Sequence, residues 1–462
     1  MAACDPLDLA IPTLGTCQIA SPMKALLDGR QTSQHYVGEH DRVLFDDTAS
    51  MVAARGGTLA DLPGFEPAGA RQKIYFDPAK TRVGIVTCGG LCPGLNNVIR
   101  GLVMELWFHY GVRKIYGFTG GFRGFIPEHG QSVIDLTPEA VSNIHDDGGT
   151  ILGTSRGRQE SDQIVDCLDR MGISILFVIG GDGSLRGAMK ISEIVASRNE
   201  KISVIGIPKT IDNDIPFIDQ SFGFQTAFSE AVEAISSAHV EAKAAPHGVG
   251  LVKLMGRHSG FIACYAALAR NDANYVLIPE VPFAIDGPGG FLEHLLARVR
   301  TRGHAVVVLA EGAGQDECSA GPKKTDASGN VLLGDIGVYL KDRIKARFQE
   351  ANCELNMKYI DPSYLIRSVK ANPFDAVYCL RLAHNAVHAA MAGRTSMVVA
   401  RWHGRFVHIP MAMAVSKRNQ VDPNGDLWLS VLEATGQPRQ FHPSAAAASN
   451  PCGPSSQQPV GR

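Results

Sequence analysis

The sequence predicts an α/β protein made of two Rossmann-like α/β/α lobes with mostly parallel sheets and an active site in the cleft between the lobes. Short apolar runs alternate with amphipathic helical stretches from Val83 onward. Continuous apolar runs are typical of parallel strands that helices cover on both faces. Glycine-rich turns follow several of the runs, and the chain of 462 residues is long enough for two or three domains. Two lobes fit this number of strands better than one.

Each element follows from the local pattern. The apolar, partly β-branched runs predict strands at Val83–Cys88, Ile115–Phe118, Ile175–Ile179, Val204–Ile207, Val249–Leu254, Tyr275–Ile278, Ala305–Ala310 and Met397–Ala400. Apolar residues at helical spacing predict helices at Asn96–Tyr110, Glu160–Met171, Phe224–Ala238 and Asp375–Ala392. Because helices separate most of the strands, we expect the strands to be parallel.

Composition divides the chain into a body and two less regular ends. Residues 1–81 carry scattered Pro and Gly with short strand candidates at Arg42–Phe45 and Lys73–Phe76, which predicts an N-terminal extension packed on the body. We place the first lobe at 82–223, completed by 366–415, the second lobe at 224–365, and a C-terminal helical segment at 416–437. Residues 438–462 are rich in Ala, Ser, Pro and Gln, a composition that predicts a disordered tail.

Composition also excludes several classes of protein. Lys and Arg (44) nearly balance Asp and Glu (46), so no overall field favours a nucleic-acid partner or an anionic membrane. No apolar run is long enough to span a bilayer, and the N-terminus lacks a charged segment followed by an apolar core. The ten cysteines form no C-x-x-C pair. We therefore expect a soluble cytoplasmic protein with reduced cysteines and no membrane partner.

The stretch Ile179–Gly187, I-G-G-D-G-S-L-R-G, predicts a phosphate-binding turn. An apolar strand ends in glycines, whose backbone amides can approach an anion, and the helix that follows offers positive partial charge at its N-terminus. Asp182 in the middle would repel a bare phosphate. We therefore expect a metal ion to mediate the contact.

A second stretch, P-K-T-I-D-N-D at Pro208–Asp214, places two carboxylates behind another apolar strand. One of them can accept the proton of an attacking hydroxyl while the other assists through a metal ion. An Asx-rich turn is the alternative interpretation, since Asp and Asn favour turns through local hydrogen bonds. Because Lys209 and Thr210 accompany the carboxylates behind a buried strand, we favour a site that transfers a phosphoryl group.

Two glycine-rich loops complete the pattern. Gly89–Asn96 follows the first strand and precedes a helix, but it contains neither a Walker A motif nor G-x-G-x-x-G. The loop Gly148–Arg158 carries Arg156, which can neutralise charge on a phosphoryl group in transit. Taken alone, the first loop is equally compatible with tight packing, and Arg156 with a solvated loop.

Together these motifs resemble those of the 6-phosphofructokinases. The resemblance runs from about Val83 to Met411. It rests on G-G-x-x-P-G-x-N, G-G-D-G-S, T-I-D-N-D, M-G-R-x-S-G (Met255–Gly260), A-E-G (Ala310–Gly312) and K-Y-I-D-P-S-Y-L-I-R (Lys358–Arg367). It implies a Mg²⁺-dependent kinase that phosphorylates the 1-hydroxyl of fructose 6-phosphate and acts as a homodimer or homotetramer. The first lobe would bind the phosphoryl donor and the second would bind fructose 6-phosphate.

The resemblance implies a role for each matching residue. Asp212 resembles the general base and Asp182 the magnesium-linked carboxylate. The other catalytic residues implied are Thr210, Asp214, Arg257 and Lys209. The donor-binding residues implied are Gly89, Gly90, Arg156, Gly181, Asp182, Gly183, Ser184 and Phe122, the last of which has a core position as its alternative. The sugar would be held by Met255, Gly256, Arg257 and Glu311, and its 6-phosphate by Lys358, Tyr364 and Arg367.

Two positions bear on the phosphoryl donor. In the family, glycine after the G-G-D aspartate leaves room for the α-phosphate of a nucleotide, whereas aspartate there goes with pyrophosphate, and this chain has Gly183. Lys209 stands where pyrophosphate-dependent enzymes also have lysine. The pair resembles a mixed subgroup of ATP-dependent enzymes on a pyrophosphate-type sequence background. We therefore expect ATP, with pyrophosphate or ADP as alternatives. Gly248 stands where the bacterial pattern has an arginine for the 6-phosphate.

Two alternatives belong to other classes. A catalytically silent subunit that senses nucleotides or sugar phosphates is disfavoured because a sensor need not keep a base, and this chain keeps Asp182, Thr210, Asp212 and Arg257. A Rossmann oxidoreductase is disfavoured because no G-x-G-x-x-G opens the first helix.

Overall fold

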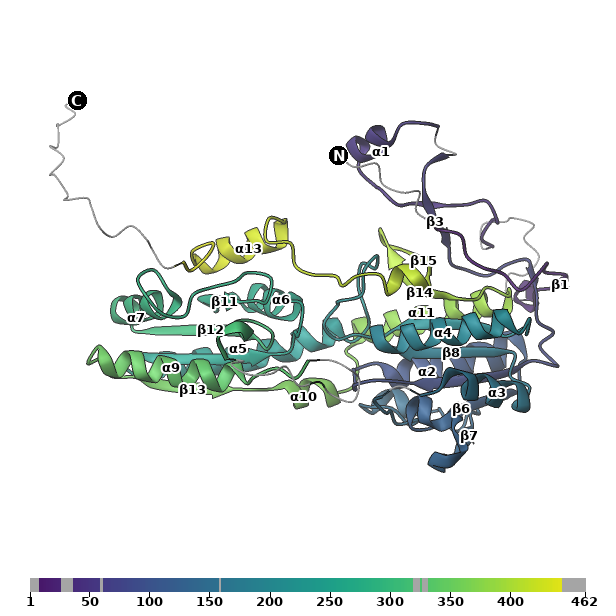
Figure 1. Ribbon diagram of the computed structural model, residues 1–462, viewed down its shortest axis with the longest axis horizontal. Coiled ribbons are helices and arrows are strands. Elements are labelled where there is room, and N and C mark those ends of the chain that lie inside the picture. The colour runs from purple at the N-terminus through teal and green to yellow at the C-terminus, as the bar shows by residue number, and fades with distance from the viewer. Residues whose placement is uncertain are drawn as a thin grey trace.

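The computed structural model describes residues 8–25, 36–58, 61–157, 159–318, 325 and 331–442. Arg158 and the tail from residue 443 onward, for which the composition predicts disorder, lie outside the described residues. The body consists of two α/β lobes that lie side by side along the long axis, and the N-terminal extension with α1 (Ala49–Arg55) lies over the larger lobe (Figure 1). The predicted α/β class with two lobes is confirmed.

The larger lobe is built on a nine-stranded sheet in the order β2-β3-β15-β14-β9-β8-β5-β6-β7. Its central strands β5, β6, β8, β9 and β14 pair in parallel. Their bounds are β5 (Arg82–Thr87), β6 (Lys114–Phe118), β8 (Ile175–Gly180), β9 (Ser203–Pro208) and β14 (Met397–Trp402). The antiparallel strands toward the edges are β2 (Val43–Leu44), β3 (Gly64–Pro67), β7 (Val133–Asp135) and β15 (Arg405–Pro410). A separate two-stranded ladder pairs β1 (Ile19–Ala20) with β4 (Lys73–Ile74).

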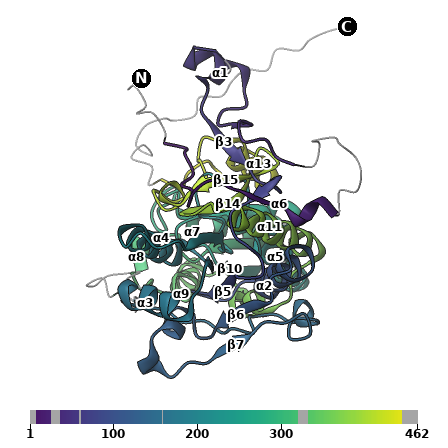
Figure 2. The ribbon, with the colours of Figure 1, turned by 90° about the vertical axis from the view of Figure 1, so that its right-hand side faces the viewer.

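Helices cover both faces of this sheet (Figure 2). One face carries α2 (Leu95–Met104), its π-helical continuation η4 (Glu105–Tyr110) and α11 (Pro373–Met391). The other carries α3 (Ser161–Met171) and α4 (Asp182–Ser197). Because both faces are covered, the central strands are mostly apolar and buried, as the sequence predicts, and charged residues such as Arg82 and Lys114 stand at strand ends.

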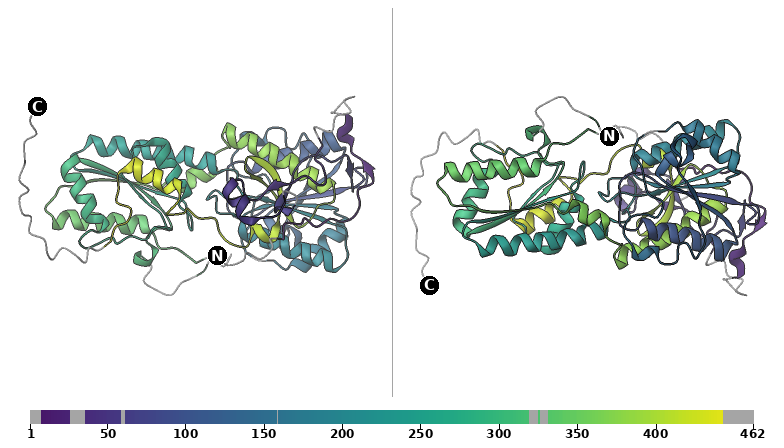
Figure 3. Two further views of the ribbon diagram at one scale, coloured as in Figure 1. Left: turned by 90° about the horizontal axis from the view of Figure 1, so that it is seen from above. Right: turned by 90° about the horizontal axis from the view of Figure 1, so that it is seen from below.

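The smaller lobe has four parallel strands in the order β11-β12-β10-β13 (Figure 3). These are β10 (Gly248–Leu254), β11 (Tyr275–Leu277), β12 (His304–Ala310) and β13 (Asn356–Ile360). Helices α5 (Phe224–Ala244) and α6 (Phe261–Arg270) pack on one face, and α7 (Phe291–Arg302) and α9 (Ile336–Glu350) on the other. The remaining short helices are η1 (Pro22–Ala25), η5 (Gly121–Phe125), η6 (Pro127–His129), η7 (Ile144–Asp146), α8 (Gln315–Cys318), α10 (Ser363–Ser368) and α12 (Met411–Ala414).

All the strands and helices expected from the body of the sequence are present, within a few residues of their expected ends. Five strands carried no clear signal, namely β1, β3, β7, β13 and β15. β13 contains Lys358 and lacks a continuous apolar run. β15 returns from β14 through His403 and Gly404, whose φ angles of 49° and 76° belong to a tight hairpin turn.

A segment that crosses from the larger to the smaller lobe follows α12, and we call residues 415–442 the C-terminal strap. Its helix α13 (Asp426–Thr435) packs on α6. The side chain of Gln437 accepts from Val276 N (2.6 Å) and donates to Val276 O (3.2 Å), in the manner of a further strand on the edge strand β11. Phe441 is 2% exposed and packs on Tyr275 and Phe291, so ordered packing continues beyond Pro438.

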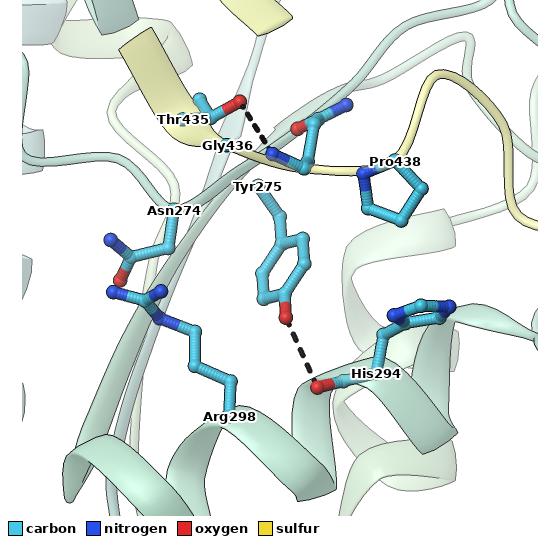
Figure 4. Close-up of a pocket in the computed structure, with 8 residues that line it drawn as sticks. Asn274, Tyr275, His294, Arg298, Thr435, Gly436 and Pro438 are labelled. Carbon is cyan, nitrogen blue, oxygen red and sulfur yellow. Dashed lines mark hydrogen bonds between the residues drawn. The ribbon is translucent and has the colours of Figure 1, made fainter. Parts of the chain in front are cut away.

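A polar pocket of about 350 Å³ lies beneath the end of the strap (Figure 4). Arg298, His294 and Asn274 line it together with Tyr275, whose hydroxyl donates to the backbone carbonyl of His294 (3.1 Å). None of the candidate site residues expected from the sequence lines this pocket. Among the described residues, no helix is both long and apolar enough to cross a membrane.

Candidate active site

Three loops of the candidate site begin at neighbouring strand ends. Strand β8 pairs with β5 on one side and with β9 on the other, so the loops after Thr87, Gly180 and Pro208 start side by side. Ligands of open parallel sheets bind at this carboxyl edge. The backbone amide of Lys209 donates to Gly180 O (2.9 Å), which fixes the last two loops to each other.

The loop after β5 is held open by contacts to its backbone. Gly89 has a φ of +86°, a conformation that favours glycine. Its carbonyl accepts from Thr154 Oγ1 (2.6 Å), and the carbonyl of Gly90 accepts from Lys209 Nζ (2.5 Å). The guanidinium of Arg156 lies 3.7 Å from the place where a Cβ of Gly90 would stand. The structure therefore brings four expected residues of the site together, from three loops.

Lys209 is almost completely buried, at 6% exposed. Burial is the main cause that lowers the pKa of its ammonium group, and the nearby Arg367 and Arg156 add to the effect. A buried ammonium group is costly unless a negative group lies beside it. Phosphate oxygens would supply that negative charge, so Lys209 is a suitable partner for them.

Helix α4 begins at Asp182, with Gly181 in extended conformation at its N-cap. A Cβ added at Gly183 would meet no atom within 4 Å, so the space in front of this turn is open. Ser184 lies in the same turn, near Gly180. Phe122 does not stand free: its ring packs against Gly187 of α4, where a Cβ would come within 2.8 Å of it. The expected donor side is therefore a helix N-terminus with space before it and an aromatic ring at its flank.

Asp212 combines burial with an unsatisfied carboxylate oxygen. Its Oδ1 is buried and has no hydrogen-bond partner. Burial, followed by the negative charges of Asp214 and Glu311, raises the pKa of Asp212 to about 7, against the opposing effect of Arg367. A carboxylate with this pKa can exchange a proton near neutral pH, as a general base must.

Asp214 and Thr210 form a second, fully bonded group beside Asp212. Thr210 Oγ1 donates to Asp214 Oδ1 (2.6 Å) and accepts from the backbone amide of Asp212 (3.2 Å). Arg418 of the C-terminal strap donates to Asp214 Oδ2 (2.9 Å), and its other terminal nitrogen lies 3.9 Å from Asp182 Oδ2. Nothing in the sequence indicated Arg418, because it lies outside every motif and far along the chain from its partners.

The second lobe meets this loop through the turn Met255–Gly260. Ser259 Oγ donates to Asp212 O (2.9 Å), and the backbone of Arg257 hydrogen-bonds the carboxylate of Asp212. Gly256 has a φ of +123° and accepts from Gly312 N (3.0 Å), while Glu311 N donates to Leu254 O (2.9 Å). This places the A-E-G turn beside the M-G-R turn.

Arg367 joins the same group. Its Nε lies 3.0 Å from the sulfur of Met255, and its charge acts on both Asp212 and Lys209. The residues expected to hold the sugar therefore surround the proposed base at the junction of the two lobes.

Lys358 and Tyr364 are not brought into this group within the chain. Lys358 Nζ forms an exposed ion pair with Glu241 (3.2 Å), and Tyr364 is 85% exposed. Packing explains why glycine stands at position 248, since a Cβ there would overlap the carbonyl oxygen of Ala242 at the end of α5. No side chain, and therefore no arginine, fits at that position without moving the helix.

A divalent cation fits the donor side of the site. Asp182 and Asp214 come from different loops, yet the single guanidinium of Arg418 approaches both, so one cation can be near both carboxylates. No group of three or more metal-binding side chains is found among the described residues. Mg²⁺ needs only one or two carboxylates from the protein, because it takes its other ligands from phosphates and water, so Asp182 and Asp214 suffice for it.

Comparisons with known proteins show which family the chain resembles along its whole body. Residues 82–390 match the sequence profile of the family described as Phosphofructokinase. The chain is 57% identical over 445 residues to the ATP-dependent 6-phosphofructokinase of Amycolatopsis methanolica, an alignment that covers 95% of this chain and 97% of the relative. It is 50% identical over 440 residues to the ATP-dependent 6-phosphofructokinase of Borreliella burgdorferi, with 94% and 97% covered.

Solved structures show the same fold at lower identity. The pyrophosphate-dependent phosphofructokinase from Marinobacter aquaeolei is 22% identical, with a TM-score of 0.63 over 77% of this chain and 91% of that one. Pichia pastoris phosphofructokinase in the T-state is 22% identical, with a TM-score of 0.60 over 77% of this chain and 37% of that one. Because its sequence matches the family profile and is 50% and 57% identical to these two relatives, the chain belongs to the phosphofructokinase family.

Proposed function

We propose that this protein is an ATP-dependent 6-phosphofructokinase of glycolysis. It transfers the terminal phosphoryl group of ATP to the 1-hydroxyl of fructose 6-phosphate and releases ADP and fructose 1,6-bisphosphate. One observation carries the proposal. Asp212 lies between the N-terminus of α4, which can bind phosphate, and the turn Met255–Gly260. Its pKa is about 7, and one of its oxygens is buried and free to accept a proton. The names of the relatives at 50% and 57% identity support the same activity.

Asp212 acts as the general base in this proposal. Its ionised carboxylate takes the proton of the 1-hydroxyl while that oxygen attacks the γ-phosphorus, and the bond from phosphorus to the bridging oxygen of ADP breaks. Thr210 and Asp214 hold the loop that carries the base, through the hydrogen bonds at 2.6 and 3.2 Å. The Arg257 backbone hydrogen-bonds the same carboxylate.

Charge that spreads over the phosphoryl oxygens is stabilised from the donor side. Lys209 and Arg156 both lie beside Gly90, whose backbone amide would be a third donor to the phosphoryl oxygens. In a site that excludes water such groups stabilise the transition state more strongly than they would in solution. The amides at the start of α4, from Gly181 to Ser184, and the ring of Phe122 would hold the rest of the nucleotide.

Mg²⁺ completes the proposed site, with Asp182 and Asp214 as the carboxylates that would hold it directly or through water. When bound, it would offset the negative charge on the phosphate oxygens of ATP. The short distances from both carboxylates to one guanidinium support this assignment.

Fructose 6-phosphate is held from the second lobe in this proposal. Met255, Gly256, Arg257 and Glu311 would position the sugar, and Arg367 the 6-phosphate. Lys358 and Tyr364 can join only if the Glu241 ion pair opens and the exposed tyrosine is covered. A homodimer or homotetramer would cover such a surface, and we propose that the enzyme forms one and acts in the cytoplasm.

ATP is the proposed donor because of Gly183, whose surroundings leave open space in front of the helix. The test is an assay of the purified protein with fructose 6-phosphate and Mg²⁺, supplied in parallel with ATP, ADP or pyrophosphate. Formation of fructose 1,6-bisphosphate with ATP alone is the expected result. Turnover with pyrophosphate would make Lys209 the better guide to the donor. No turnover with any donor would contradict catalysis and favour a silent sensing subunit.

A further inference from the structure

Arg418 is the one guanidinium in the described residues that approaches both Asp182 and Asp214. Its contacts of 2.9 Å to Asp214 and 3.9 Å to Asp182 join carboxylates from two different loops. Its side chain is 35% exposed, whereas those of Asp182 and Asp214 are 24% and 13% exposed. The positive charge of Arg418 therefore lies beside the two negative charges of Asp182 and Asp214.

The residues that follow Arg418 in the strap hold it in this place. Asn419, the next residue, donates from its backbone amide to Asp214 O (2.8 Å) and from its side chain to Asn213 O (3.1 Å). Gln420 then donates to His258 O (2.9 Å) in the second lobe. These successive contacts bind residues 418–420 to the loop that carries Asp212 and Asp214 and to the turn Met255–Gly260.

A half-buried carboxylate, that of Glu280, binds the next residue of the strap. Glu280 Oε1 accepts from the backbone amides of Val421 and Gly260, each at 2.9 Å. Arg418 also acts on His258, because burial, followed by the charges of Arg418 and Arg257, lowers the pKa of the His258 imidazole. Arg418 is thus placed by a series of specific contacts, unlike a side chain that is free to sample the surface.

The two carboxylates differ in their other partners. Asp182 also pairs with Arg186 one turn along α4 (3.1 Å), whose side chain is 51% exposed. Asp214 has Thr210 as its other partner, which is neutral. Removal of Arg418 would therefore leave Asp214 without a positive partner and would weaken the neutralisation of Asp182.

We propose that Arg418 is the resident counter-cation of the donor site: it neutralises Asp182 and Asp214 in the metal-free enzyme and yields their oxygens to the divalent cation that arrives with the nucleotide. The inference rests on the proposed function for the identity of that cation. Its physical basis is competition, because a guanidinium and a metal ion that share the same carboxylate oxygens repel each other at distances of a few ångströms. The consequence is that the free enzyme binds a divalent cation weakly until phosphate oxygens supply further ligands.

The test measures binding of Mn²⁺, as a probe for Mg²⁺, to the full-length protein without nucleotide or sugar phosphate. Mn²⁺ bound at pH 8 is quantified by electron paramagnetic resonance or calorimetry. We expect Arg418→Gln to tighten Mn²⁺ binding by about tenfold, since loss of one unit charge near the metal is worth at least about 1.4 kcal/mol at short range. Lys417→Gln is the matched control, because Lys417 lies over the Phe217 ring at 5.0 Å and has no contact to either carboxylate. Its Mn²⁺ affinity should equal that of the unsubstituted protein.

A second pair of variants identifies the site and guards against misfolding. Asp182→Asn combined with Arg418→Gln should abolish the tight Mn²⁺ binding. If Arg418→Gln does not fold, Arg418→Lys replaces it. A single ammonium group cannot approach both carboxylates as the two terminal nitrogens of the guanidinium do, so we expect Mn²⁺ affinity to rise by about threefold. Unchanged or weaker Mn²⁺ binding after either substitution would overturn the proposal, as would tight binding that survives Asp182→Asn. Because no substrate is present, this result is independent of the kinase assay, and either can fail alone.

Discussion

Asp212 and Asp214 stand two residues apart on one loop, yet their carboxylates are in opposite situations. Both oxygens of Asp214 are bonded, Oδ1 to Thr210 (2.6 Å) and Oδ2 to Arg418 (2.9 Å), whereas Oδ1 of Asp212 is buried without a partner. Burial and nearby negative charges raise the pKa of Asp212 to about 7. This difference in hydrogen bonding separates two roles: Asp212 has an oxygen available to accept a proton, whereas Asp214 is held in place by its partners.

The first prediction concerns the pH dependence of the reaction. A base must be ionised to accept a proton, so kcat/KM for fructose 6-phosphate should fall as pH drops through the pKa of Asp212, about 7. Initial rates measured between pH 5.5 and 9 test this. A limb near 6 would instead report the 6-phosphate of the sugar, whose second pKa is about 6. Such a limb would contradict the raised pKa of Asp212.

The second prediction is that Asp212→Asn lowers kcat by at least ~10² while the Kd for fructose 6-phosphate changes little, because a base contributes mainly in the transition state. Single-turnover assays and equilibrium binding of the sugar phosphate measure the two quantities. Asp219→Asn, on the same segment but exposed and bonded to the turn at His403, serves as the control and should keep kcat. A kcat for Asp212→Asn that matches this control would remove Asp212 from the role of base.

The third prediction concerns the donor. Gly183→Asp should abolish the use of ATP, because a carboxylate placed in the open space before α4 would exclude and repel the α-phosphate. The space itself is free of protein atoms, so the substitution should leave the melting temperature nearly unchanged. Gly183→Ala is the control for the loss of glycine at this helix position. Retained ATP turnover in Gly183→Asp would show that the nucleotide does not occupy this space.

The sequence predicted the fold well because its strands are buried on both faces. Strand β8, from Ile175 to Gly180, has no exposed residue, and such runs can be recognised without knowledge of their partners. The loops at the ends of these strands were predicted for the same reason, since parallel strands place their carboxyl ends at one edge.

Other features depend on contacts between residues that are distant in the sequence. Arg418 lies 204 residues from Asp214, and no periodicity or motif relates the two. The pKa of Asp212 depends on Glu311 and Arg367, which only the folded chain brings near. For Lys358 and Tyr364 the sequence motif predicted a place in the site, but in the single chain both side chains are exposed to solvent.

The last prediction concerns Glu66, which joins the N-terminal extension to the larger lobe. Its Oε1 accepts from Arg71 (2.6 Å), Arg394 (3.0 Å) and His408 (3.0 Å). Burial works against its charge, but the hydrogen bond from His408 and the charges of His408, Arg394 and Arg71 outweigh it and lower the pKa of Glu66 to about 2. The stabilisation is therefore present above the unfolded-state pKa, near 4.5, and is lost as pH falls toward 2.

We expect Glu66→Gln to destabilise the protein by about 3 kcal/mol at pH 7, because two buried arginines would lose their shared carboxylate. Urea midpoints of the larger lobe, followed at several pH values, measure the change. The difference between the variant and the unsubstituted protein should shrink below about pH 4, since protonation removes the same charge that the substitution removes. Glu39→Gln is the matched control: Glu39 contacts Arg394 at 2.6 Å but its side chain is 58% exposed, so its loss should cost no more than about 1 kcal/mol. Equal losses in the two variants, or a difference that persists at low pH, would mean that burial of the Glu66 charge contributes nothing to anchoring the extension.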